Sequence, residues 1–198
     1  RNKNVNVYAK KLKKKKGFKG RNKNVGVYAE NLFTKPEDCL NYSVYYYEIK
    51  CKFEVDLNDD KKMGIALKNC STNDRIELFP KYAEIFNEDN ESFKLSSFIW
   101  NNNDIFGCGL VYPPTNKMNE EFPFAFFTHN GKQIGKGILL KENFDFYKPY
   151  VLLYCCSLIA VLLFLLYCCS VEANFGNNLE TRAFSYDITK LKILEEFY

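Results

Sequence analysis

The sequence predicts an all-β protein in which short antiparallel strands form a sandwich or a barrel. Aromatic residues make up 17% of the 198 residues, and most are Phe or Tyr in short alternating runs. Aromatic side chains favour strands because they pack well on a pleated surface. Turn residues separate the runs at intervals of about 8–12 residues, which is typical of sandwiches and barrels.

Residues 122–139, FPFAFFTHNGKQIGKGIL, predict a β-hairpin around Asn130-Gly131. A two-residue type I′ turn needs a positive φ at both central positions, and Asn and Gly tolerate that best. Gly135 and Gly137 lie within the second arm, where glycine suggests a bulge or the close approach of another backbone. The first arm alternates aromatic side chains along one side: Phe122, Phe124 and Phe126.

The stretch 45–55, YYYEIKCKFEV, predicts a strand with one buried and one solvated face, because apolar and charged residues alternate along it. The buried face would carry Tyr47, Ile49, Cys51, Phe53 and Val55, and the solvated face Glu48, Lys50, Lys52 and Glu54. Other strands are expected at 25–29, 63–67, 76–79, 103–112, 171–176 and 184–188. We expect an exposed loop at 82–92, and the tail 189–198 is compatible with a short C-terminal helix.

A duplicated segment marks the N-terminal arm, where RNKNVNVYA at 1–9 returns as RNKNVGVYA at 21–29. Six lysines lie between Lys10 and Lys16. Residues 1–24 are predicted to be a disordered basic arm, because this charge density with few core residues cannot offset the entropy of ordering. The lysine run fits a solvated tail, a nuclear-import signal, or a contact with phosphate backbone or anionic lipid.

A single domain spanning 25–198 is expected after this arm, and it is long enough to bury a sizeable core. The chain has 28 basic and 24 acidic residues, and residues 1–35 hold 12 of the basic residues and one of the acidic residues. The rest of the chain holds 16 basic and 23 acidic residues, so it is acidic. The eight cysteines form no C-x-x-C pair, and the charged N-terminal residues include no apolar segment typical of a secretory signal. We therefore expect reduced thiols and a cytoplasmic or nuclear protein.

Several stretches resemble motifs of the SPRY domain, in the order in which that family carries them. They are YYYEIK at 45–50, NDIFGCGL at 103–110, FFTHNGKQIGK at 126–136, and VEANFG at 171–176 followed by FSYDI at 184–188. The chain is similar to SPRY domains, especially the Ran-binding-protein-M-like branch. The resemblance implies a bent antiparallel sandwich of two sheets, without catalytic machinery, that binds a peptide or a partner protein through loops at one edge. The loop before Trp100 lacks the aromatic–glycine pattern of that branch, so the identity of the ligand does not carry over.

An uncharged stretch of 20 residues, VLLYCCSLIAVLLFLLYCCS at 151–170, has the length and polarity of a membrane span. It contains LLYCCS at both 152–157 and 165–170. A span would separate the hairpin from the closing strand across a bilayer, and the sandwich could not close. We therefore favour an insertion at about 158–170 within a soluble sandwich, where it would form an exposed apolar patch.

The sequence favours a non-catalytic adaptor or scaffold that binds a protein or a short peptide. Protein interfaces are rich in aromatic anchors, so the candidate partner-binding residues are the aromatic residues of loops and strand ends. These candidates are Tyr82, Phe86, Tyr112 and Tyr154.

No enzyme, cofactor or metal site is expected. His129 has no sequence-adjacent partner for general-base chemistry, and beside a turn it is expected to be exposed. Adjacent cysteines suit tetrahedral metal coordination poorly, and few aromatic residues near the lysine run could stack on nucleic-acid bases. Two alternatives stay open: a membrane-associated protein with a span at 151–170, aided by the basic arm, and a secreted parasite effector of the SPRY type, which would need a signal peptide.

Overall fold

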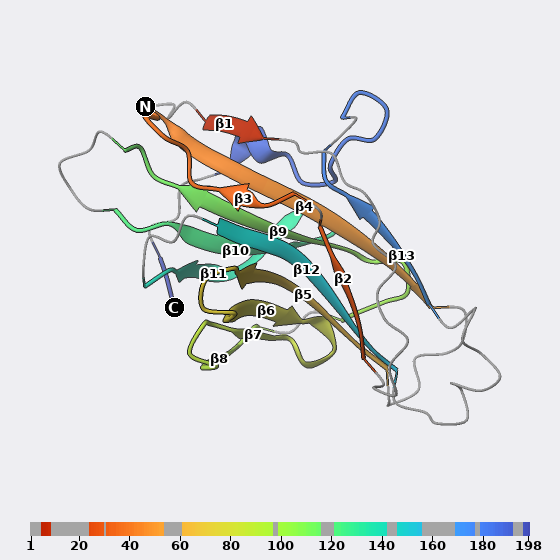
Figure 1. Cartoon of the computed structure of the whole chain (residues 1–198). Helices are drawn as coiled ribbons and strands as arrows, with labels where there is room; N and C mark the ends of the chain where they lie inside the picture. Colours follow the sequence, from red (N-terminus) through yellow and green to blue (C-terminus); the bar gives the residue numbers. More distant parts are fainter. Residues whose placement is uncertain are drawn as a thin grey trace.

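The computed structural model describes residues 5–8, 24–29, 31–53, 61–96, 99–115, 121–141, 146–155, 169–176, 179–191 and 196–198. Over these residues the chain forms two sheets, almost wholly antiparallel, that pack against each other with very little helix (Figure 1). The prediction of an all-β sandwich is therefore confirmed. We name each sheet after its longest strand, the β4 sheet and the β12 sheet.

The β4 sheet has the strand order β1-β4-β9-β10-β11, and β13 also pairs with β4. Its strands are β1 (Val5–Tyr8), β4 (Tyr42–Phe53), β9 (Ile105–Tyr112), β10 (Phe124–His129), β11 (Lys132–Leu139) and β13 (Cys169–Asn174). Strands β1 and β13 lie along the same side of β4, where β1 pairs with Tyr42–Tyr45 and β13 with Glu48–Phe53.

The β12 sheet has the strand order β2-β12-β5-β6-β7-β8, and β3 also pairs with β12. Its strands are β2 (Asn24–Tyr28), β3 (Phe33–Thr34), β5 (Lys61–Asn69), β6 (Arg75–Phe79), β7 (Glu84–Phe86), β8 (Ser92–Lys94) and β12 (Phe146–Cys155). Two single 3₁₀ turns, η1 (Pro80–Tyr82) and η2 (Ile188–Lys190), complete the described elements.

The main core lies between the two sheets and includes Tyr47 and Ile49 of β4 with Ile65 and Leu67 of β5. The Tyr47 hydroxyl spans this core and donates a hydrogen bond to the carbonyl oxygen of Ala66 at 2.6 Å. Burial raises the pKa of Tyr47 well above its ordinary value, so the hydroxyl keeps its proton and stays a donor. The expected buried face of β4 is therefore confirmed at these positions.

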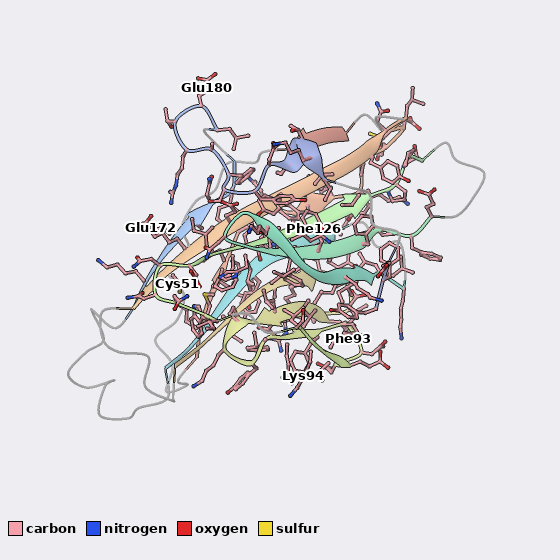
Figure 2. The ribbon with its side chains drawn as sticks, turned by 180° about the vertical axis from the view of Figure 1, so that it is seen from behind. Cys51, Phe93, Lys94, Phe126, Glu172 and Glu180 are labelled. Carbon is pink, nitrogen blue, oxygen red and sulfur yellow. The ribbon has the colours of Figure 1, made fainter. Side chains whose placement is uncertain are left out.

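A smaller core covers the opposite face of the β4 sheet, where the C-terminal segment folds back over it. Figure 2 shows Phe126 in the middle of the sheet seen from this side. The ring of Tyr46 stacks on Phe126 at 5.9 Å and meets Phe184 edge-on at 4.9 Å. The buried members are Tyr42, Val44, Tyr46, Val111, Phe124, Phe126, Ile188 and Leu191.

Glu48 corrects the prediction of a solvated face on this strand. Its residue is only 4% exposed, and its carboxylate accepts hydrogen bonds from the backbone N–H groups of Ser185 and Tyr186 at 2.9 Å each. Alternation identified which residues share a face with Glu48, but it gave no sign that a distant segment covers that face.

The hairpin prediction is confirmed. Asn130 and Gly131 have φ of 47° and 77°, and β10 pairs with β11 on either side of them. The register shifts between Ala125 and Phe127, so β11 carries a bulge, and Gly135 adopts φ of 66° within it. The bulge is the irregularity that the glycines of the second arm indicated.

Three local predictions need correction. The expected loop at 82–92 contains strand β7 and the start of β8. The expected strand at 184–188 is irregular backbone that leads into η2, and over the described residues of the tail η2 is the only helical turn. Strand β1 pairs in parallel with β4, so this part of the arm is ordered, where disorder was expected.

The ends of the apolar run belong to the sandwich. Its first five residues, 151–155, lie in β12 and pair with β5, and 169–170 lie in β13 and pair with β4. The expected insertion at 158–170 falls largely within 156–168, which lie outside the described residues. In the described part of the chain, no helix has the length and apolar character needed to cross a membrane.

Candidate functional site

Three aromatic side chains gather where β6 turns into β7, and we call Phe79, Tyr82 and Phe86 the aromatic edge. Phe79 lies between the other two, with ring centroids 6.5 Å from Tyr82 and 5.7 Å from Phe86. The Phe79–Phe86 contact is edge-on, an arrangement that aromatic quadrupoles favour. Two of the four predicted partner-binding residues, Tyr82 and Phe86, are thus brought together.

The local sequence explains why the chain presents these rings. Pro80 cannot donate to a strand ladder, so β6 ends at Phe79 and the chain forms η1. Ala83 then adopts a left-handed conformation with φ of 50°, and its carbonyl oxygen accepts a hydrogen bond from the Leu95 N–H at 2.8 Å. This bond fixes the turn to the chain after β8, so Tyr82 projects from a tethered turn.

The exposure of the aromatic edge makes it available to a partner. The Tyr82 residue is 41% exposed, and Phe79 and Phe86 are partly exposed. Charged groups lie on the adjoining strands, where Lys94 of β8 pairs with Glu84 of β7 at 3.8 Å. Figure 2 shows Phe93 and Lys94 on β8, at the margin of the β12 sheet. The site can therefore offer apolar ring surface at its centre and charges at its rim.

A buried carboxyl group adjoins the aromatic edge. Glu77 lies directly opposite Phe86 in the β6–β7 pair and on the same outward face as Phe79, because Ile76 and Leu78 point into the main core. It is 5% exposed, and within the described part of the structure its Oε1 atom has no hydrogen-bond partner. Burial raises the pKa of Glu77 to about 7, and the nearby charge of Arg75 offsets part of this effect.

The structure does not group the other two candidates with the aromatic edge. Tyr112, at the end of β9, is 1% exposed and meets Tyr45 edge-on at 6.1 Å. Its ring belongs to the main core, so it is not a surface residue as the sequence interpretation required. Tyr154 pairs with Lys62 and Asn24 in the β12 sheet, and its side chain lies outside the described atoms.

His129 is less exposed than the sequence indicated. A ring nitrogen lies 2.9 Å from the Asp104 carboxylate, which also accepts hydrogen bonds from the Asn130 side-chain amide and the Asn101 N–H. Burial raises the pKa of Asp104, but these hydrogen bonds and the His129 ring outweigh it and hold the pKa below its ordinary value. The cluster ties the start of β9 to the hairpin turn, because the Ile105 N–H also donates to the Asn130 side chain.

Sequence reasoning missed Phe79 and Glu77 as parts of the site. Phe79 was assigned to a strand, and the proline that follows it was the signal that its ring lies at a strand end. Glu77 alternates with two core residues, so its outward direction was predictable, but its burial depends on neighbouring strands. Over the described residues, no group of three or more His, Cys, Asp or Glu side chains could hold a metal ion.

Comparison with protein-family models finds no match, and comparison with curated proteins finds no significantly similar sequence.

Proposed function

We propose that this chain is a non-catalytic interaction module of the SPRY type, an adaptor or scaffold that binds a protein or a short peptide. The observation that supports this proposal best is the aromatic edge. A 41% exposed tyrosine lies on a turn tethered by a backbone hydrogen bond, and two partly exposed phenylalanines lie on the adjoining strands. Together they have the composition of an interface anchor.

The geometry suits an apolar or aromatic partner side chain with polar flanks. Such a side chain would cover Tyr82 and Phe86, which have little rotamer freedom to lose. Polar groups of the partner would meet Lys94 and Glu84 at the rim, where charges add orientation and association rate more than affinity.

Alanine substitution of both rings tests the proposal. We expect the Tyr82→Ala/Phe86→Ala variant to lose the specific partners that the wild-type chain captures, as quantified by mass spectrometry of affinity-purified complexes. Thermal unfolding measured in parallel separates lost binding from lost folding.

Phe146→Ala is a matched control. Phe146 is 43% exposed. It lies five residues before Val151 on β12, and Val151 is level with Ile65 of β5 and Leu78 of β6, the residue before Phe79. It therefore sits towards the opposite end of the β12 sheet from the aromatic edge. Capture of the same partners by the double variant and by the wild type would refute the proposed site.

A further inference from the structure

The two copies of the duplicated segment pair with different sheets. Val5–Tyr8 of the first copy forms β1 on the margin of the β4 sheet, and Asn24–Tyr28 of the second copy forms β2 on the margin of the β12 sheet (Figure 1). The copies, RNKNVNVYA and RNKNVGVYA, differ at one position, which is Asn6 in the first and Gly26 in the second. Backbone hydrogen bonds alone cannot distinguish two segments this similar.

Gly26 lies where a larger residue would not fit. A Cβ atom added to Gly26 would lie 2.8 Å from Cε2 of Tyr150 and 3.2 Å from its hydroxyl oxygen. Carbon atoms in contact normally stay at least about 3.5 Å apart, so any side chain at this position must displace the tyrosine ring. Asparagine would add three further heavy atoms beyond Cβ.

The ring of Tyr150 is held in place from several directions. It stacks on Tyr28 with ring centroids 4.5 Å apart, and it packs with Ala66 and Leu152 in a small buried cluster. The guanidinium of Arg75 lies 6.0 Å from the centroid of the Tyr150 ring, and Tyr150 is only 5% exposed. A displaced ring would lose these contacts, so the overlap is not relieved by a simple side-chain rotation.

We propose that Gly26 determines which copy of the repeat occupies the edge of β12, and that Asn6 excludes the first copy from it. The first copy is thereby left to pair with β4, where its backbone runs parallel to Tyr42–Tyr45. The duplication supplies one edge strand to each sheet, and the Asn6 side chain keeps the first copy from competing for the edge of β12.

Swapping Asn6 and Gly26 tests the proposal, and the readout is hydrogen–deuterium exchange of the backbone amides in the full chain. In Gly26→Asn we expect amide exchange in 24–28 and along 150–154 of β12 to become at least about tenfold faster, the scale of a 1–3 kcal/mol overpacking penalty. In Asn6→Gly/Gly26→Asn, the first copy carries the glycine and can occupy the same edge. Protection of 150–154 should then return, while 24–28 stays unprotected.

A second substitution identifies the Tyr150 ring as the cause. In a Tyr150→Leu background, which removes the overlapping ring atoms, Gly26→Asn should change exchange in 24–28 less than threefold. The proposal is wrong if Gly26→Asn leaves protection of 24–28 unchanged, or if the double exchange fails to restore 150–154. Asn6→Gly alone is the control for the first position, and it should leave 24–28 protected to at least half the wild-type extent, because the second copy has the shorter connection to β3.

Discussion

Glu48 accepts a hydrogen bond from the backbone N–H of Tyr186, a residue 138 positions later in the chain. The other carboxylate oxygen accepts from the N–H of Ser185, and the Tyr46 hydroxyl donates to the same group at 3.1 Å. One buried side chain on β4 therefore fixes the C-terminal segment onto the outer face of the β4 sheet.

Glu48→Gln should loosen this segment. An amide side chain accepts only at its oxygen, so one backbone N–H loses its acceptor and the other keeps only a neutral one, at a cost of about 1–3 kcal/mol. We expect this decrease in the free energy of urea unfolding, with faster amide exchange at 184–191. Glu172→Gln is the control, because that exposed carboxylate pairs with Arg182 on the surface and should change stability by less than about 1 kcal/mol.

Tyr112→Ala and Tyr82→Ala should separate core from surface. Removal of the buried Tyr112 ring should cost about 3–5 kcal/mol of unfolding free energy, because it leaves a cavity in the main core. Removal of the exposed Tyr82 ring should cost less than about 1 kcal/mol. Equal losses in chemical denaturation would contradict this assignment of the two residues.

Glu77→Gln should change the pH dependence of stability. The folded state holds the proton of Glu77 up to about pH 7, whereas the ordinary pKa is 4.5, so the native state binds more protons between these values. The contribution of Glu77 to stability is therefore complete below about pH 4.5. It is lost as the pH rises through about 7, by roughly 3 kcal/mol.

The neutral amide that Glu77→Gln introduces cannot ionise, so the variant should lack this fall. Urea unfolding at pH 5 and pH 8 measures the difference between variant and wild type. A difference that does not grow in favour of the variant at pH 8 would show that the carboxyl group ionises without penalty.

Asp104→Asn should destabilise the end of the hairpin, and the loss of stability should be larger at higher pH, opposite to the trend for Glu77. The pKa of Asp104 is lowered in the folded state, so its ionised form contributes stability above its ordinary pKa of 3.8, and that contribution is lost as the pH falls through the folded pKa. We expect the variant to be about 1–3 kcal/mol less stable at pH 6, and closer to the wild type at pH 3. Unfolding curves at both pH values test this, and a constant difference would contradict it.

Local patterns predicted most of the strands because each pattern depends on few neighbours. The Asn130-Gly131 turn and the alternation around Tyr47 were sufficient for β10, β11 and β4. The apolar character of 151–155 did not distinguish a membrane span from a strand. In the structure these residues lie in β12, between β5 and β2, and the sequence pattern gave no sign of these two neighbours.

The candidate site was only partly predictable. Tyr82 and Phe86 were identified because proline and polar residues predicted a surface segment around them. Tyr112 was misjudged because a residue at a strand end can point either to the core or to solvent, and only the packing of Tyr45 against it decides. Glu48 is buried by a segment far away in the chain, and Glu77 is buried among neighbouring strands, and alternation along a single strand reveals neither.

The position of β4 in its sheet has a consequence for synthesis. Its neighbours β9 and β13 end 59 and 121 residues after it, at Tyr112 and Asn174. A ribosome adds about 5–20 residues per second, so β4 emerges roughly 6–24 s before its last partner. During that interval the Glu48–Phe53 part of β4 lacks its β13 neighbour, and an unpaired strand edge can associate with other chains. Shielding of this edge until β13 is made would therefore reduce the association of nascent chains.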